Sequence, residues 1–326
     1  MVMVRVLPIS DPGTLDAAIE VLRRGEPVAI PTETVYGLAA DATNPEAITA
    51  IYEAKERPRF NPLISHVADL EMARAHVVFS PVAERLAAAF WPGPLTLVLP
   101  LSAESRIHPL ATAGLGTAAV RVPQGPAREL IARFGGPLAA PSANRSGRIS
   151  PTTSQHVAED LGDRIELILD GGRCPVGLES TILLIDGTRL QLLRPGGIPV
   201  ELIEEAAGSV VERPGLQPED GPVVAPGMLA SHYAPDTQLR LNATEARPGE
   251  AIIRFGGVAL KGEDEAKVVM DLSPSRDLRE AAANLFDLLK KADAAGARGI
   301  AVAPVPGHGL GEAINDRLRR AAAPKD

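Results

Sequence analysis

The sequence predicts an α/β protein made of two units that are joined by a linker. The chain has 326 residues, which is long for a single domain. Short apolar runs typical of buried strands are interspersed with amphipathic helical patterns in both parts of the chain. Between them, residues 208–236 are rich in proline and glycine and show no helical period. We therefore expect a first unit at 1–207 and a smaller α/β unit at 237–326.

Helices in the first unit follow from apolar spacing and from end signals. The helical spacing that begins at Leu15 ends at Gly25, a residue typical of helix stops. Asn44 and Pro45 favour a helix start, and Pro58 disfavours a helical residue before it. We expect helices at residues 15–24, 45–57, 81–90 and 199–207.

Short apolar segments bounded by proline and glycine predict the strands. In the first unit these are residues 27–32, 61–67, 95–100, 117–123, 137–140, 164–172, 177–185 and 190–198. In the second unit they are residues 251–255, 267–273 and 299–305, with an amphipathic helix at 276–295 and a last helix after a glycine turn. That turn, GHGLG, has no P-loop lysine beside it, so we interpret it as structural.

Composition limits the class of protein. The chain is 45% hydrophobic and 23% charged, which is typical of a soluble globular protein. A net charge of -8 and 3% aromatic residues argue against a general nucleic-acid coat, although a local basic cleft stays open. The single cysteine, Cys174, excludes a disulfide framework and a multi-cysteine zinc site. We find no signal peptide and no apolar run long enough to span a membrane, so we expect a cytoplasmic protein.

The segment KERPRFNPLISH, residues 55–66, combines cations with polar side chains near the end of a predicted helix. Lys55 is the only lysine in the first 260 residues. Its ammonium is a compact charge that can follow a phosphate, whereas the planar guanidinium of Arg57 fixes one. The pair suits a nucleotide phosphate chain. The alternative is two solvated charges that complement the helix dipole.

Three further sites carry residue types that suit anionic ligands. Residues 136–152, GPLAAPSANRSGRISPT, place small hydroxyls, amides and glycines after a strand, although no Walker loop is present. Arg121 lies in an apolar strand and needs either a protein carboxylate or a substrate carboxylate. Arg194 ends a strand before a Pro-Gly-Gly turn.

His66 is either a core histidine or a polar contact in a cleft. In the linker, His232 and Tyr233 indicate that this segment docks on another part of the chain.

Taken together, these segments resemble the YrdC-like family of threonylcarbamoyl-AMP synthases in its longer, two-domain form. The matching segments are PTETVYGLAAD (31–41), AKERPRFNPLISHV (54–67), WPGPLTLVL (91–99), AVRVP (119–123), APSANRSGRISPT (140–152), DGG with GLEST (170–181), LLRPGGI (192–198) and APGMLASHYAP (225–235). The resemblance implies a YrdC-like twisted mixed sheet with flanking helices, and a smaller Rossmann-like α/β C-terminal domain.

The resemblance also implies a reaction and its partners. L-Threonine, bicarbonate or CO2, and ATP would give threonylcarbamoyl-AMP and diphosphate, the first step of N6-threonylcarbamoyl modification of adenosine 37 in tRNA. We expect transient contact with the tRNA threonylcarbamoyl-transferase complex and tRNA. No cluster of Asp or Glu stands out at metal-ligand spacing, so we expect Mg²⁺ to be held through ATP phosphates and waters.

Roles transfer from the family residue by residue. The catalytic signature, Lys-x-Arg followed by Ser-x-Asn, corresponds to Lys55, Arg57, Ser142 and Asn144. The residues implied to contact threonine or its carbamate are Thr34, His66, Arg121, Ser142 and Ser180. Those implied to contact ATP are Lys55, Arg57, Asn61, Thr117, the backbone of Ala140, Asn144, Ser150, Arg194 and Tyr233. The linker, 208–236, would act as a lid that excludes water from the labile intermediates.

Three other functions compete with this one. An RNA- or nucleotide-binding maturation factor without adenylate-forming activity would use the same basic cleft, but net acidity argues against it. A carbamoyl-adenylate enzyme related to hydrogenase maturation factors would carry multi-cysteine zinc motifs, and the single cysteine here argues against that function. A regulatory paralogue would bind nucleotide without turnover.

Overall fold

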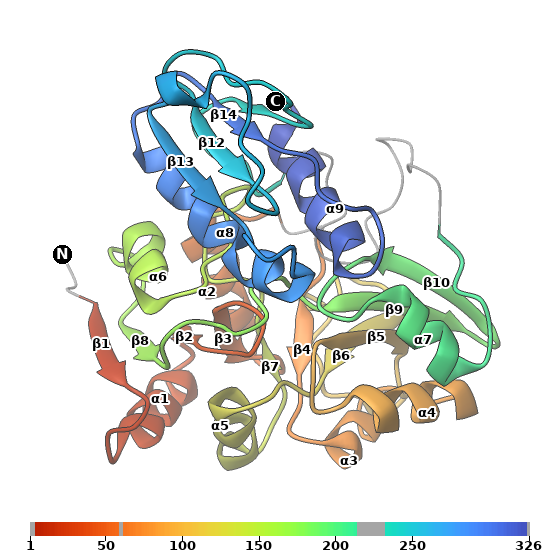
Figure 1. Cartoon of the computed structure of the whole chain (residues 1–326). Helices are drawn as coiled ribbons and strands as arrows, with labels where there is room; N and C mark the ends of the chain where they lie inside the picture. The colour runs from red at the N-terminus through yellow and green to blue at the C-terminus, as the bar shows by residue number, and fades with distance from the viewer. Residues whose placement is uncertain (1–3, 59–60, 214–231, 325–326) are drawn as a thin grey trace.

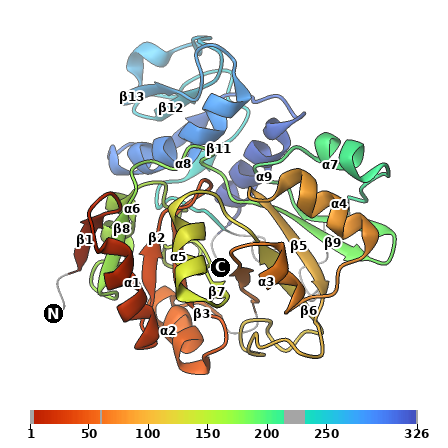
Figure 2. The ribbon, with the colours of Figure 1, turned by 90° about the horizontal axis from the view of Figure 1, so that it is seen from below.

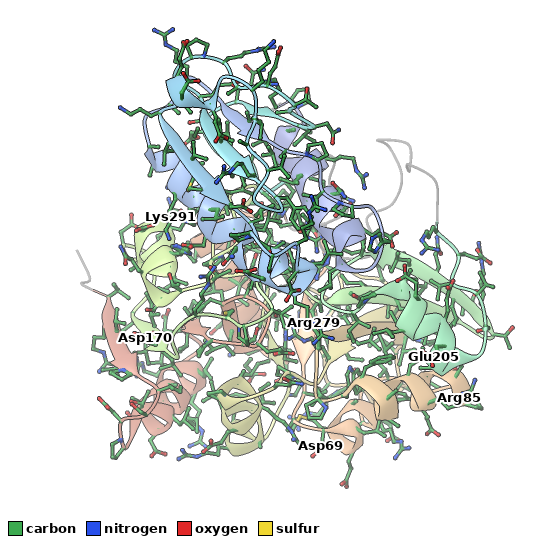
Figure 3. All side chains as sticks on the ribbon, viewed as in Figure 1. Asp69, Arg85, Asp170, Glu205, Arg279 and Lys291 are labelled. Atoms are coloured by element: carbon green, nitrogen blue, oxygen red, sulfur yellow. The ribbon has the colours of Figure 1, made fainter. Side chains whose placement is uncertain are left out.

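The computed structural model describes residues 4–58, 61–213 and 232–324, and in it the chain forms two units. Figure 1 shows the smaller, C-terminal unit (blue) seated on the larger one. Figure 2 shows the same chain from below, with the helices of the larger unit around its strands. These helices pack on both faces of the sheet. Charged side chains such as Arg85, Glu205 and Lys291 lie on the outside of both units (Figure 3).

The larger unit is organised around a mixed sheet with strand order β1-β8-β2-β3-β7-β4-β6-β5-β9-β10 among the described residues. Its strands are β1 (Arg5–Pro8), β2 (Val28–Ile30), β3 (Gly37–Asp41), β4 (Ile64–His66), β5 (Leu95–Pro100), β6 (Thr117–Arg121), β7 (Leu138–Ala139), β8 (Leu167–Asp170), β9 (Thr181–Asp186) and β10 (Arg189–Arg194). Parallel pairs such as β4–β6 and β5–β9 alternate with antiparallel pairs such as β2–β3 and β5–β6. This is the twisted mixed sheet that the motifs predicted.

Four of the helices described in the larger unit begin at a side-chain cap. The helices of this unit are α1 (Thr14–Arg23), α2 (Pro45–Lys55), α3 (Leu70–Arg74), α4 (Pro81–Phe90), α5 (Pro126–Phe134), α6 (Ser154–Leu161) and α7 (Val200–Ala207). The Asn44 side chain accepts hydrogen bonds from two first-turn amides of α2, and Ser80 caps α4 in the same way. Each helix buries an apolar stripe, and the fully buried Ile48 and Ile51 of α2 each contribute about 1.5–3 kcal/mol.

Several elements differ from the sequence predictions. β1, β3, α3, α5 and α6 were not predicted, although α5 has apolar residues at helical spacing. β3 is the clearest case: its sequence, GLAAD, has no β-branched residue, and pairing with β2 and β7 makes it a strand. α2 ends at Lys55 rather than near Arg57, because Glu56 adopts the left-handed conformation with φ of 52°.

The smaller unit is a parallel sheet with strand order β11-β14-β12-β13. Its elements are β11 (Leu239–Arg240), β12 (Ala251–Arg254), the 3-10 helix η1 (Glu263–Glu265), β13 (Val268–Asp271), α8 (Leu278–Ala294), β14 (Ile300–Val302) and α9 (Leu310–Ala322). All were predicted except η1 and the two-residue β11, which is too short to carry a pattern. α8 and α9 lie between this sheet and the larger unit (Figure 1).

The two units share one apolar core. Val35, Ile149 and Leu178 of the larger unit belong to the same buried cluster as Phe286 on α8. The backbone of Gly177, with φ of +72°, approaches α8 so closely that a Cβ there would lie 2.5 Å from a helix Cα atom. The C-terminal unit is therefore packed against the larger one rather than tethered to it.

The predicted linker, 208–236, lies largely outside the described residues, which omit 214–231. Its first residues belong to the larger unit: the Glu212 amide donates to the Leu190 carbonyl, and Val211 is buried. The structure thus extends that unit beyond the predicted boundary at 207, because Val211 completes the core beside β10. Among the described residues, no helix combines the length and the apolar character needed to cross a membrane.

Candidate active site

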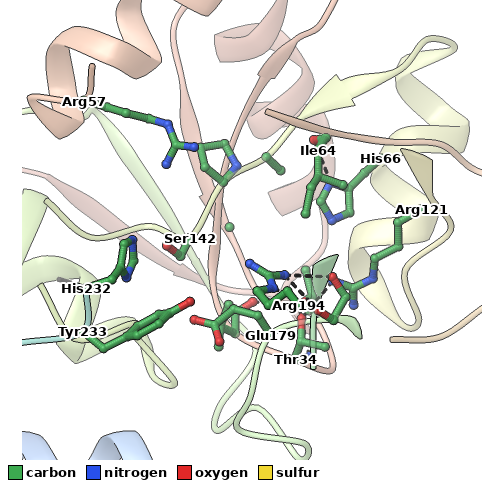
Figure 4. A pocket seen from close by; sticks show the side chains of 16 residues that line it. Thr34, Arg57, Ile64, His66, Arg121, Ser142, Glu179, Arg194, His232 and Tyr233 are labelled. Atoms are coloured by element: carbon green, nitrogen blue, oxygen red, sulfur yellow. Dashed lines mark hydrogen bonds between the residues drawn. The ribbon is translucent and has the colours of Figure 1, made fainter. Parts of the chain in front are cut away.

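A buried cleft gathers side chains that are far apart in the sequence. It lies over the large sheet and is bordered by His232 and Tyr233, which precede the smaller unit (Figure 4). The lining consists of Thr32, Thr34, Val35, Gly37, Arg57, Ile64, His66, Arg121, Ala140, Pro141, Ser142, Glu179, Ser180, Arg194, His232 and Tyr233. Of the residues predicted for a site, the lining omits Lys55, Asn61, Thr117, Asn144 and Ser150.

Three arginines give the cleft a strong positive charge. Arg57 follows α2, Arg121 ends β6 and Arg194 ends β10, and each is less than 9% exposed. Arg57 donates to the carbonyl oxygens of Asn61 (3.4 Å) and Pro62 (3.0 Å). Burial lowers the pKa of Arg57 to about 10, so it stays charged at neutral pH. Such a concentration of buried cations attracts an anionic ligand.

Arg121 has a protein carboxylate as its partner. One of its terminal nitrogens lies 2.6 Å from Glu33 Oε1, and both side chains are buried. The guanidinium also donates to the Gly93 carbonyl (3.1 Å) and to Thr34 Oγ1 (3.0 Å). Of the two partners that the sequence left open, the protein carboxylate is therefore present. A substrate carboxylate would have to share Arg121 with Glu33, a residue that the sequence analysis did not select.

His66 lies beside Arg121 because β4 and β6 pair in register at these two residues. It lines the cleft and is 2% exposed. Burial and then the charge of Arg121 lower the pKa of His66 to about 3. The imidazole is therefore neutral at physiological pH, with Nδ1 lying 3.3 Å from the Ile64 carbonyl oxygen. His66 thus acts as a polar contact and not as a cation.

Arg194 and Ser180 form a second polar group in the same cleft, where β9 and β10 follow β5 in the sheet. Arg194 donates to the Ser180 carbonyl from Nε (3.2 Å) and Nη2 (2.9 Å), and Ser180 Oγ lies 2.7 Å from Thr96 Oγ1. The turn after Arg194 requires glycine, since a Cβ on Gly196 would lie 2.4 Å from the Glu179 carbonyl oxygen. This contact holds the Pro-Gly-Gly turn against the segment that carries Ser180.

Glu179 is the carboxylate of the lining, and the sequence analysis gave it no role. Its Oε1 accepts from Ser150 Oγ (2.5 Å) and its Oε2 from Arg317 Nε (2.8 Å). Burial alone would raise the pKa of Glu179, but the charges of Arg317 and Arg194 lower it to about 2. A glutamate in a segment predicted to be a buried strand needs a charged or hydrogen-bonding partner, and this need was the signal in the sequence that could have identified Glu179. Arg317 lies in the other unit and could not be identified from spacing.

Lys55 lies beneath the cleft rather than in its wall. Its side chain is 1% exposed, and Nζ donates to the carbonyl oxygens of Ser142 (2.5 Å) and Asn144. Burial, followed by the charge of Arg57, lowers the pKa of Lys55 well below its usual value. The alternative of two solvated charges at a helix end is wrong, because Lys55 and Arg57 are both buried. Lys55 instead supports the loop that carries Ser142.

The predicted residues outside the lining differ in their surroundings. Asn61 is buried, and neither polar atom of its amide has a hydrogen-bond partner among the described residues. The Asn144 Nδ2 group donates to the carbonyls of Arg145 (2.8 Å) and Arg148 (3.0 Å). Its Oδ1 has no hydrogen-bond partner among the residues that the structure describes. Thr117 begins β6 and is half-buried. The unpaired amide atoms are places where a ligand could complete the hydrogen bonding.

Among the described residues, no three His, Cys, Asp or Glu side chains lie close enough together to hold a metal ion. Both carboxylate oxygens of Glu179 already accept hydrogen bonds. Cys174 is a free, buried thiol, and burial raises its pKa to about 12.

Known proteins match this chain along most of its length. Residues 20–196 match the Sua5/YciO/YrdC family model, described as "Telomere recombination", and residues 198–323 match "Threonylcarbamoyl-AMP synthase, C-terminal domain". The chain is 42% identical over 330 residues to the threonylcarbamoyl-AMP synthase of Bacillus subtilis (strain 168), covering 97% of this chain and 94% of the relative. It is 42% identical over 316 residues to that of Pyrococcus abyssi (strain GE5 / Orsay), covering 92% of each. The crystal structure of P. abyssi Sua5 complexed with L-threonine aligns with a TM-score of 0.88 at 37% identity, covering 98% of this chain and 97% of that chain.

Proposed function

The chain belongs to the Sua5/YciO/YrdC family and has the activity of a threonylcarbamoyl-AMP synthase, and from this premise we propose that the buried cleft is its active site. The family predicted from the motifs is confirmed, as are the mixed α/β fold and the assignment as an enzyme that forms an AMP adduct. The proposal concerns where the substrates bind and what each side chain does.

The convergence of Arg57, Arg121 and Arg194 on one cleft carries this proposal. The amine of threonine attacks CO2 with loss of a proton to solvent, or bicarbonate with loss of water, to give an N-carboxylate. An oxygen of that carboxylate then attacks the α-phosphorus of ATP, and diphosphate leaves with the electrons of the broken P–O bond. Both reactants are anionic, so they approach each other only where fixed cations offset their repulsion. No covalent nucleophile is needed.

Threonine and its carbamate fit the part of the cleft around Arg121. Thr34, Ser142 and Ser180 offer hydroxyls there, and Thr34 Oγ1 already contacts Arg121 at 3.0 Å. His66 adds a polar contact to this part of the cleft. Because its imidazole is neutral, it is not an acid that would protonate the attacking amine of threonine. The charge of Arg121 is shared between Glu33 and the substrate, so it orients the substrate carboxylate without binding it too tightly for release.

ATP fits the part of the cleft between Arg57, Arg194 and Tyr233, all of which line it. The unpaired amide atoms of Asn61 and Asn144 would complete their hydrogen bonds on the nucleotide. The remaining contacts implied by the family, Thr117, the Ala140 backbone and Ser150, belong to this proposal too. Lys55 would act from beneath, by shaping the loop at Ser142 and Asn144.

We propose that Mg²⁺ enters with ATP as the Mg·ATP substrate. Glu179 has both oxygens engaged, which leaves the phosphates and water as ligands. When bound, the ion would offset phosphate charge. Contact with tRNA and with the tRNA threonylcarbamoyl-transferase complex is also a proposal, supported by the instability of an acyl-adenylate that must reach its acceptor quickly. A cytoplasmic location is a further proposal.

Diphosphate release tests the proposal. Purified protein would be supplied with Mg·ATP and bicarbonate, with and without L-threonine. Arg194→Ala would be compared with Arg279→Ala, an exposed arginine that is not part of the lining. We expect threonine-dependent release that Arg194→Ala abolishes and Arg279→Ala retains. Equal activity in both variants would place the reaction elsewhere. A wild-type protein that binds ATP but releases no diphosphate would indicate a binding factor instead.

A further inference from the structure

Arg317, on α9 of the smaller unit, reaches the base of the cleft in the larger one. Its side chain has no exposed surface, and its Nε lies 2.8 Å from Glu179 Oε2. Its Nη1 is 2.6 Å from Asp316 Oδ2, and its guanidinium lies over the Tyr233 ring, 5.2 Å from the centroid. Arg317 does not line the cleft itself. It touches two residues that do, Glu179 and Tyr233.

The charge of Glu179 makes this contact important for a nucleotide. Glu179 is the one acidic side chain among the sixteen residues of the lining, and it shares the cleft with Arg194 (Figure 4). A carboxylate without a partner there would repel ATP phosphates and would also attract the Arg194 guanidinium. With Arg317 and Arg194 beside it, Glu179 has a pKa of about 2, so its carboxylate is charged near neutral pH. The Arg317 guanidinium is a permanent cation that offsets this charge.

We propose that Arg317 is a positioning residue, supplied by the C-terminal unit, which offsets the charge of Glu179 and so lowers its repulsion of the nucleotide phosphates. This inference rests on the proposed function of the cleft. It gives the second unit a role in the chemistry: its α9 carries the countercharge for an acidic group of the active site. Tyr233, packed between Arg317 and Phe286, is held at the cleft by the same contacts.

The simpler alternative is that Arg317 only fastens the two units together. Arg173 provides a matched comparison, because it joins the same units outside the cleft. Its Nη2 donates to the Ala283 carbonyl (2.8 Å) and to Asn284 Oδ1 (2.9 Å) on α8. If fastening were the whole role, removal of either arginine would affect activity in the same way.

The test compares Arg317→Met, Glu179→Gln, the double variant and Arg173→Met. For each we would measure kcat and KM for ATP and for threonine, ATP affinity by calorimetry and the melting temperature. Arg317→Met should weaken ATP binding by about tenfold or more, because an uncompensated carboxylate then faces the phosphates. The double variant should recover most of that loss, because the carboxylate is gone. Arg173→Met should retain wild-type ATP affinity.

A double variant no better than Arg317→Met, or an equal loss in Arg173→Met, would overturn the inference. If Arg317→Met does not fold, Glu179→Gln alone decides the question: it removes the acidic charge from the lining, leaves Arg317 paired with Asp316 and should tighten ATP binding. Unchanged or weaker binding would count against the proposal. Failure of the proposed function would be recognised separately, because the wild type itself would then lack threonine-dependent diphosphate release.

Discussion

The ammonium nitrogen of Lys55 lies 2.5 Å from the carbonyl oxygen of Ser142, and it also donates to the carbonyl oxygen of Asn144. Two motifs that are separated by 87 residues in the chain therefore form one physical unit. The lysine fixes the backbone of the loop, and the loop presents the Ser142 hydroxyl to the cleft. The Lys-x-Arg pair thus divides its work, because Arg57 lines the cleft and Lys55 supports it.

Replacing Lys55 by methionine should destabilise the protein and reduce its activity together. Two buried carbonyl oxygens lose their donor, which costs about 1–3 kcal/mol, and the loop at Ser142 loses its support. Urea unfolding and threonine-dependent diphosphate release measure the two effects. Lys261→Met, at an exposed lysine in the other unit, is the control. Wild-type stability in Lys55→Met would contradict the supporting role.

Replacing Arg121 by glutamine should cost about 3–5 kcal/mol of stability, because Glu33 is then left as a buried, unpaired charge. The double variant Glu33→Gln/Arg121→Gln should regain much of that stability. Under the proposed function it should not regain threonine affinity, since the cation proposed to orient the substrate is still absent. Chemical denaturation and the KM for threonine separate the two roles. If the double variant regained both stability and threonine affinity, the role of Arg121 would be purely structural.

His66 should make the protein less stable in mild acid. Its folded-state pKa of about 3 lies below the ordinary value of 6.5, so only the unfolded chain binds a proton between these values. The stabilisation is complete above pH 6.5 and falls by about 1.4 kcal/mol for each pH unit below it. His66→Asn should show a correspondingly smaller slope of unfolding free energy between pH 6.5 and 5. Identical slopes would show that His66 is protonated in the folded protein.

Cys174 should be inert towards thiol reagents in the native protein. It is 2% exposed, and burial raises its pKa to about 12, so little reactive thiolate forms near neutral pH. Labelling by Ellman's reagent should be slow until denaturant is added, and Cys174→Ala should retain threonine-dependent activity. Rapid native labelling would mean that the β8–β9 segment opens readily.

Local signals were sufficient for part of the fold. α4 and β5 occupy the residues predicted for them, because a Ser-Pro start, a proline-glycine stop and a continuous apolar run act over a few residues. β3 was missed because its alanines carry no strand preference of their own. It forms where β2 and β7 supply its hydrogen bonds, and those strands lie at either side of it only after the chain has folded.

The sequence by itself determined the family, and with it the activity and most of the residues that line the cleft, because short motifs keep their order and spacing along the chain. Only the tertiary structure decided how those residues are paired. The sequence could state that Arg121 needs an anion, but not that Glu33 supplies it. It placed Lys55 at a helix end without showing that the helix end is buried. It could not join Glu179 to Arg317, since these residues are 138 positions apart and belong to different units. Charge pairing in a buried cleft depends on which surfaces pack together. Local sequence patterns do not show which residues of two distant segments will lie side by side after folding.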